Sequence, residues 1–123
     1  HITNLIQIPY VANTPELIGI MDGLIITSRY EGLPIVSIEA MGMGTPILST
    51  DSGDTKRFVE TNHCGLIIDD AMSDKENFIR FRRELTTYRE NAFQHSEKML
   101  EYFSAGNIAK QYLQTFQKAV NKA

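Results

Sequence analysis

The sequence predicts an α/β domain with a Rossmann-like parallel sheet, covered by helices on both faces in three layers, and a helical C-terminal part. Short β-branched runs alternate with helical patterns up to about residue 69, which is typical of a parallel sheet. Beyond residue 70 only helical spacing remains. The chain has 123 residues, with 42% hydrophobic and 22% charged content, which suits one globular domain. We therefore expect a single domain over 1–123, helical over 70–123.

The alternating part begins with a strand and a capped helix. We expect strands at 5–8, 24–27, 46–50 and 66–69. Thr14 suits the N-cap of the first helix and Pro15 its first position. Gly23 is expected to end this helix as a left-handed cap, and Gly42 and Gly44 are expected to end the next helix. A short helix is expected over 55–61.

Apolar side chains recur at helical spacing through the last fifty residues. Ser104 is expected to cap the final helix. The stripes are predicted to face the core rather than a ligand, and they contain Phe78, Phe81, Leu85, Tyr88, Met99, Leu100, Phe103, Ile108, Tyr112, Leu113, Phe116 and Val120.

Composition and scattered reactive residues exclude several function classes. The net charge of −3 argues against a nucleic-acid partner. Cys64 is the one cysteine, so we expect a small packing residue in a reducing compartment. Three scattered histidines, His1, His63 and His95, have no metal-ligand spacing. No apolar run approaches the roughly 20 residues of a membrane span, and no signal peptide is recognised, so a cytoplasmic location is expected.

The central stretch, residues 28–41, joins an apolar strand to an apolar helix and contains two carboxylates. Glu31 and Glu39 have seven residues between them. Gly32 lets the chain turn and leaves room for a ligand, and Pro34 suits the first turn of the helix. The amides that follow lie at the positive end of the helix dipole, which favours phosphate. From the residues alone, Glu31 also fits a surface carboxylate or cap partner, and Glu39 a core carboxylate satisfied by backbone.

This stretch resembles the E-x7-E motif of the group 1 (family 4) retaining glycosyltransferases of GT-B fold. The match comprises Glu31-Gly32-Leu33-Pro34, then Ile38-Glu39-Ala40-Met41 and Gly44-Thr45-Pro46, and the likeness extends from Asn4 to Ala123. The resemblance implies the donor-binding part of a hexosyltransferase. It assigns Glu31 to the transferred sugar, as the catalytic residue, and Glu39 to the ribose hydroxyls of the donor. It assigns Gly32, Leu33, Pro34 and Ile35 to the donor, with their free amides on its diphosphate.

The family needs no metal or other cofactor, and the nucleoside-diphosphate sugar is a substrate. The resemblance places the basic phosphate loop and the N-terminal acceptor domain outside this sequence. We therefore expect a piece of a longer protein that is inactive by itself. Similar proteins often act in bacterial surface polysaccharide or glycolipid synthesis.

If the chain is a piece of a longer protein, its sheet lacks some of the strands of a complete Rossmann sheet. A Rossmann sheet has strand order 3-2-1-4-5-6. If the chain begins at the third strand, the three later strands remain adjacent in chain order, whereas the strand at 5–8 lacks its neighbours. We expect it to be displaced, or to pair with another chain by strand exchange or dimerisation, or with a segment outside this sequence.

Two sets of basic residues can each be interpreted either as solvated surface residues or as binding residues. Arg29 and Arg57 fit solvated arginines better than phosphate ligands. The family's G-G-x-x-E pattern is here Gly53-Asp54-Thr55-Lys56-Arg57, which lacks the second glycine and the acid. The cluster of Arg80, Arg82, Arg83 and Arg89 is interleaved with Glu76, Glu84 and Glu90. It fits a salt-bridged solvated face, and the alternative is a weak association with anionic lipid at the inner membrane surface.

Two other function classes compete with the donor-binding part. One is a non-catalytic Rossmann-like interaction module, which a buried and saturated Glu39 would favour. The other is a nucleotide-sugar epimerase of the same architecture, which lacks motif support.

Overall fold

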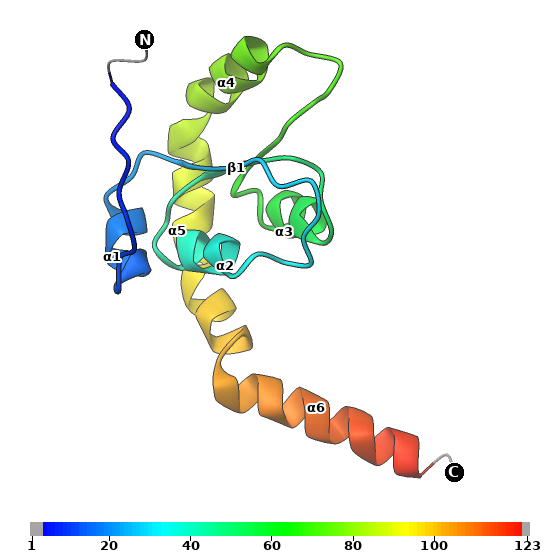
Figure 1. Cartoon of the computed structure of the whole chain (residues 1–123). Helices are drawn as coiled ribbons and strands as arrows, with labels where there is room; N and C mark the ends of the chain where they lie inside the picture. The colour runs from blue at the N-terminus through cyan, green and yellow to red at the C-terminus, as the bar shows by residue number, and fades with distance from the viewer. Residues whose placement is uncertain (1–3, 122–123) are drawn as a thin grey trace.

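The computed structural model describes residues 4–121, and in this part of the chain a three-stranded parallel sheet is surrounded by helices (Figure 1). The sheet has the order β1-β2-β3. The elements follow one another as α1 (Thr14–Gly19), β1 (Leu24–Ile26), α2 (Ile35–Gly42), β2 (Ile47–Ser49), α3 (Thr55–Asn62), β3 (Gly65–Ile67), α4 (Asp74–Arg83), α5 (Leu85–Tyr102) and α6 (Ala105–Val120). The predicted α/β class and the helical C-terminal part are confirmed.

The two faces of the sheet are covered by different helices. In β2, Ile47 packs into a core cluster with residues of α2 and α3, whereas its neighbour Leu48 packs against Phe81 and Tyr88 of α4 and α5. Consecutive residues of a strand point to opposite faces, so helices lie on both sides of the sheet. The register pairs Ile47 with Leu24 and with Gly65.

Cys64 lies immediately before β3 and is fully buried. Burial raises the pKa of its thiol to about 12, because the charged thiolate would lose its hydration. The residue is therefore a neutral packing side chain, as the sequence predicted.

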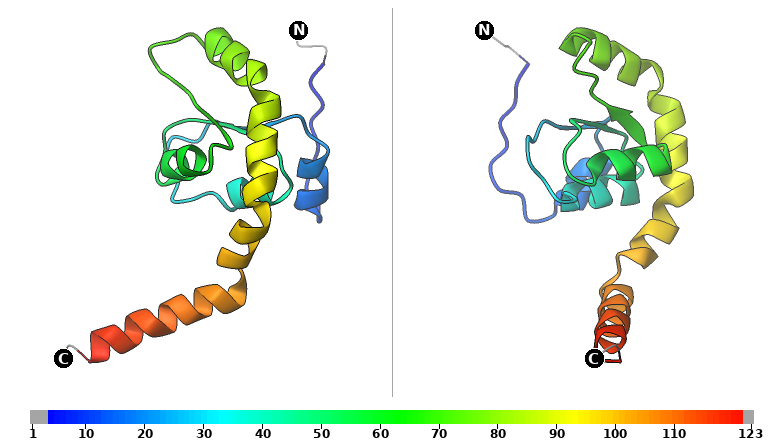
Figure 2. Two further views of the ribbon diagram at one scale, coloured as in Figure 1. Left: turned by 180° about the vertical axis from the view of Figure 1, so that it is seen from behind. Right: turned by 90° about the vertical axis from the view of Figure 1, so that its right-hand side faces the viewer.

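The strand predicted at 5–8 is wrong. Residues 5–8 form no strand in the structure, and the exposed fractions of Leu5 and Ile6 are 73% and 82%. The segment runs outside the sheet as an extended chain (Figure 2). The segment is displaced from β1, as the predicted strand order requires. It forms no strand because a β-branched sequence becomes a strand only where a partner offers hydrogen bonds.

Two helix starts differ from the predictions by one position. The N-cap of α1 is Asn13 rather than Thr14. Pro34 is the N-cap of α2, in an extended conformation, rather than the first residue of its first turn. Helix ends commonly shift by one or two residues.

The final helix, α6, does not face the core, which corrects the prediction for its apolar stripe. Figures 1 and 2 show α6 leaving the body at the end of α5 and extending away from the sheet. Tyr112, Leu113, Phe116 and Val120 are exposed, at 59–72%. Upstream, Phe81 and Tyr88 are buried as predicted, whereas Phe78 and Leu100 are about half exposed. Helical spacing shows that a face is apolar but not that something in the same chain covers it.

Candidate functional site

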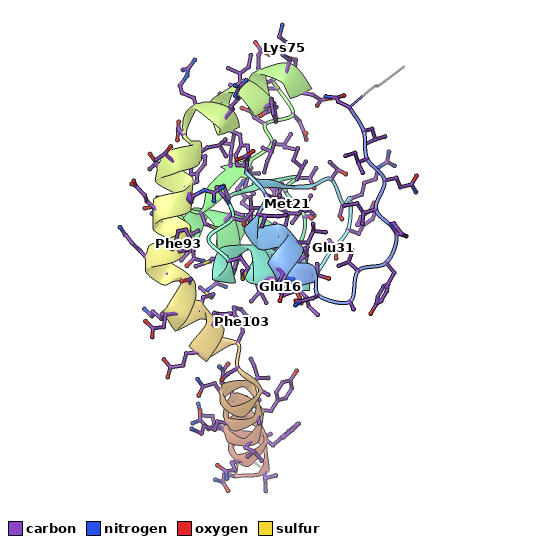
Figure 3. The ribbon with its side chains drawn as sticks, turned by 90° about the vertical axis from the view of Figure 1, so that its left-hand side faces the viewer. Glu16, Met21, Glu31, Lys75, Phe93 and Phe103 are labelled. Atoms are coloured by element: carbon purple, nitrogen blue, oxygen red, sulfur yellow. The ribbon has the colours of Figure 1, made fainter. Side chains whose placement is uncertain are left out.

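The predicted motif lies at the carboxyl edge of the sheet, where parallel α/β sheets bind ligands. Residues 27–34 connect the end of β1 to the start of α2, and Glu31 lies in the middle of this connection. Glu31 and Gly32 are exposed, and Figure 3 shows Glu31 on the side of the body away from α5. The structure thus places the motif's first carboxylate on an accessible loop.

The loop after β2, residues 50–54, is hydrogen-bonded to the Glu31 loop, which follows the neighbouring strand β1. The backbone N–H of Thr50 donates to the Ile26 carbonyl over 3.0 Å, and its Oγ1 donates to the Ser28 carbonyl over 2.6 Å. Further along, the Asp54 N–H donates to the Gly32 carbonyl over 2.9 Å. Both ends of the Glu31 loop are therefore fixed by residues of the 50–54 loop.

Gly53 makes this close approach possible. Its φ is +53°, in the left-handed region that glycine adopts at little cost. A Cβ at this position would collide with the backbone carbonyls of Glu31 and Gly32. At Gly32 itself φ is not left-handed, and a Cβ there would meet nothing within 4 Å. The need for a glycine conformation, predicted at Gly32, is therefore found at Gly53 instead. The open space predicted beside Gly32 is present.

Helix α2 begins with free donors. Across residues 4–121, the amides of Gly32, Leu33 and Ile35 donate no hydrogen bond and no side chain caps α2. Pro34, which has no N–H, is buried. Unsatisfied amides at a helix N-terminus attract anions. The geometry of this helix start is therefore compatible with a phosphate group.

Glu39 follows one turn later on α2. Its side chain is half-buried, and in the described part of the chain its carboxylate accepts no hydrogen bond. Among the described residues its oxygens do not belong to the buried polar atoms that lack a partner, so they remain open to solvent or a ligand. It is thus not the saturated core carboxylate of the alternative interpretation.

Three buried hydroxyls near these loops were not singled out from the sequence. Ser37, Ser52 and Thr55 are at most 4% exposed, and their oxygens have no hydrogen-bond partner. Ser37 lies in the first turn of α2, and the other two flank Gly53. Small hydroxyl residues carry no signal of this kind in a sequence, because burial and pairing depend on the fold.

A cavity of about 650 Å³ opens beside the motif, between α3 and the end of α5. Its apolar wall includes Leu33, Phe58, Met99 and Phe103, and Figure 3 shows Phe103 at the foot of α5. Arg57 of α3 also lines this cavity and is exposed, while Arg29 is exposed on the Glu31 loop. Both arginines are accessible to solvent, as predicted.

The basic cluster is not the salt-bridged face that its spacing predicted. Lys56–Asp51 is the sole ion pair among residues 4–121. Arg89 instead donates to the carbonyls of Met21 and Asp22, at 3.0 and 3.3 Å. Glu76 forms a capping box with Ser73 at the start of α4, and these hydrogen bonds lower the pKa of its carboxyl. Glu76 is thus used in a helix cap and Arg89 in backbone contacts, rather than in the expected ion pairs.

Between residues 4 and 121, no three or more His, Cys, Asp or Glu side chains gather as a metal site would require. None of the helices described there is both long and apolar enough to cross a bilayer.

The profile of the family described as glycosyl transferases group 1 matches residues 2–101. The chain belongs to this family. Among curated relatives, an alpha-maltose-1-phosphate synthase of Mycolicibacterium smegmatis is 27% identical over 111 residues, which cover 84% of this chain and 29% of that protein. The Vi polysaccharide biosynthesis protein VipC/TviE of Salmonella typhi is 43% identical over 53 residues, 43% of this chain and 9% of the relative.

A solved glycosyltransferase structure also matches this group 1 glycosyltransferase chain. WaaG, a glycosyltransferase involved in lipopolysaccharide biosynthesis, superposes with a TM-score of 0.56 at 26% identity. The match covers 67% of this chain and 24% of WaaG. The chain thus spans less than a third of the length of these proteins, and its fold corresponds to part of a GT-B enzyme.

Proposed function

We propose that this chain is the donor-binding portion of a retaining glycosyltransferase that transfers a hexose from a nucleoside-diphosphate sugar to an acceptor. In this proposal the free amides of Gly32, Leu33 and Ile35 face the diphosphate. Glu39 accepts hydrogen bonds from the ribose hydroxyls, and Glu31 contacts the transferred sugar. The carboxylate of Glu39 carries the proposal, since it is half-buried at the ligand-binding edge without a hydrogen bond within residues 4–121.

In glycosyl transfer, the N-terminus of α2 would stabilise the leaving group. Negative charge grows on the departing nucleoside diphosphate in the transition state. Fixed N–H dipoles stabilise that charge without reorganising. Pro34 supports this role by ending the loop in a fixed extended conformation. In this proposal the reaction needs no metal and no other cofactor.

The remaining groups come from outside this sequence. The proposed partners are the nucleotide-sugar donor and the acceptor domain of the longer protein, with no nucleic acid. The matched relatives include proteins named for polysaccharide and lipopolysaccharide biosynthesis. We therefore propose a role in surface polysaccharide or glycolipid synthesis, at a cytoplasmic location with weak association at the membrane surface. By itself the 123-residue chain is proposed to be inactive.

The experiment is thermal stabilisation of the whole protein that contains this chain, with UDP, GDP, ADP and TDP, beside a Glu39→Gln variant. A nucleotide at about 100 times its Kd adds roughly 2.7 kcal/mol to stability. We expect one nucleotide to raise the Tm of the wild type, and Glu39→Gln to lose most of that shift.

Glu60→Gln is the matched control, because Glu60 is an exposed carboxylate on α3. It should retain the full shift. If no nucleotide raises the Tm of the wild type, the donor-binding proposal is rejected in favour of the non-catalytic module.

A further inference from the structure

We propose that Thr50 is a positioning residue for Glu31, acting through the backbone of the loop that carries it. This inference rests on the proposed function, because it gives Glu31 a task that depends on its placement. Glu31 is exposed, and within residues 4–121 its carboxylate forms no hydrogen bond. Its position must therefore be set by its own backbone.

Thr50 supplies the side-chain bond that joins the two loops. Its N–H continues the β1–β2 ladder to Ile26, and its Oγ1 reaches one step further, to the Ser28 carbonyl three residues before Glu31. At 2.6 Å this is a short hydroxyl–carbonyl hydrogen bond. The hydroxyl thus continues the inter-strand hydrogen bonding beyond the end of β1, into the Glu31 loop.

The second attachment, after Glu31, is made by backbone. Asp54 N–H donates to the Gly32 carbonyl, and Gly53 packs on the carbonyls of Glu31 and Gly32. Glu31 is bracketed between these two attachments. Among the described hydrogen bonds between the two loops, the Thr50 hydroxyl is the one that a substitution can remove while the backbone stays intact.

The residue type fits a fixed donor. Thr50 is half-buried, and its β-branched side chain has a restricted χ1. A misplacement of about 1 Å of a group near the reacting atoms can reduce the rate by about a hundredfold. Loosening the Ser28 end should therefore affect transfer more than nucleotide binding, which depends on Glu39 and α2.

The test compares Thr50→Val, which keeps the shape but loses the hydroxyl, with Thr50→Ser, which keeps the hydroxyl. Thr45→Val is the matched control, because Thr45 Oγ1 donates to the Ile18 carbonyl over 2.9 Å and ties α1 rather than the Glu31 loop. The first readout is amide hydrogen exchange in the whole protein at Thr50 and Asp54, whose N–H groups donate to the Ile26 and Gly32 carbonyls at the two ends of the Glu31 loop, each rate being corrected for the intrinsic rate of its sequence. Loss of one net hydrogen bond predicts about fivefold faster exchange there for Thr50→Val, with Thr50→Ser and Thr45→Val unchanged.

The second readout is release of nucleoside diphosphate from hexose derivatives of the nucleotide that stabilises the wild type. We expect kcat to fall at least about tenfold for Thr50→Val, while the Kd of the free nucleotide stays within twofold. Recovery of kcat by Thr50→Ser would support the hydroxyl as the cause.

Two results would overturn the role of Thr50. One is unchanged exchange in Thr50→Val, and the other is an equal fall in kcat for Thr45→Val. A wild type that binds no nucleotide rejects the proposed function instead, and the exchange comparison then decides alone whether Thr50 holds the loop.

Discussion

Glu31 owes its surroundings to residues outside the E-x7-E stretch. The 50–54 loop reaches across from β2, and Gly53 lets its backbone lie against the Glu31 carbonyl. The proposed active loop is therefore shaped by Gly53, which lies on the loop after the neighbouring strand, rather than by its own Gly32.

Gly53→Ala tests that shaping role. The substitution forces a side chain into a left-handed conformation, which costs roughly 1–2 kcal/mol, and drives a Cβ against two carbonyls. We expect the free energy of unfolding to fall by about 1–3 kcal/mol in urea titrations. Gly106→Ala is the control, since a Cβ there meets nothing within 4 Å on α6, and helix propensity predicts a small gain. Equal stability of the two variants would contradict the close approach at Gly53.

At the scale of elements, one amide side chain joins the start of α4 to the turn after β3. Asn77 is 1% exposed, and it accepts a hydrogen bond from the Asp69 N–H while donating to the Asp69 carbonyl, each over 2.9 Å. It also donates to the carbonyl of Ser73, four residues before it. The turn after β3 is thus closed by Asn77 rather than by apolar packing alone.

Asn77→Ala should open that turn. The substitution leaves a part-buried amide and carbonyl of Asp69 without their partner, which costs about 1–3 kcal/mol. We expect a lower midpoint in urea, measured by circular dichroism. Asn91→Ala removes one exposed hydrogen bond, to the His63 carbonyl, and should cost less than half as much. A larger loss for Asn91→Ala than for Asn77→Ala would refute this account of the turn.

The molecule as a whole consists of a folded α/β body and a projecting helix. α6 packs mainly on α5, while its apolar side chains remain exposed. In the described part of the chain nothing covers this face, and exposed apolar faces of this size favour association.

Removal of residues 105–123 should therefore leave the body intact. We expect the unfolding free energy to change by less than about 1 kcal/mol, because few buried contacts are lost. The shorter chain should also remain monomeric at higher concentration in sedimentation experiments. Phe81→Ala, in the core, should cost about 3–5 kcal/mol by comparison. Global unfolding of the shortened chain would show that α6 is part of the core after all.

The sequence by itself determined the α/β class, the order of the strands from β1 to β3, the place of the helical part and the family. The class and the helical part follow from β-branched runs and helical spacing, the family from the E-G-x-P and E-A-M segments, and the strand order from the Rossmann topology. The same reasoning located Glu31 at the carboxyl edge of the sheet, since a loop after a parallel strand has nowhere else to lie. The roles of Glu31, Glu39 and residues 32–35, and the single-domain organisation, stay predictions.

Only the tertiary structure decided which of these patterns have partners. Residues 5–8 and the α6 stripe have the composition of a strand and of a buried helix face, yet both are exposed, because pairing and burial require a neighbour that a local pattern does not supply. For the same reason Arg89 of the arginine cluster donates to carbonyls instead of carboxylates, and the Thr50 hydroxyl meets the Ser28 carbonyl across 22 positions of sequence. Long-range hydrogen bonds form where the fold brings two groups together, and sequence spacing does not encode that distance.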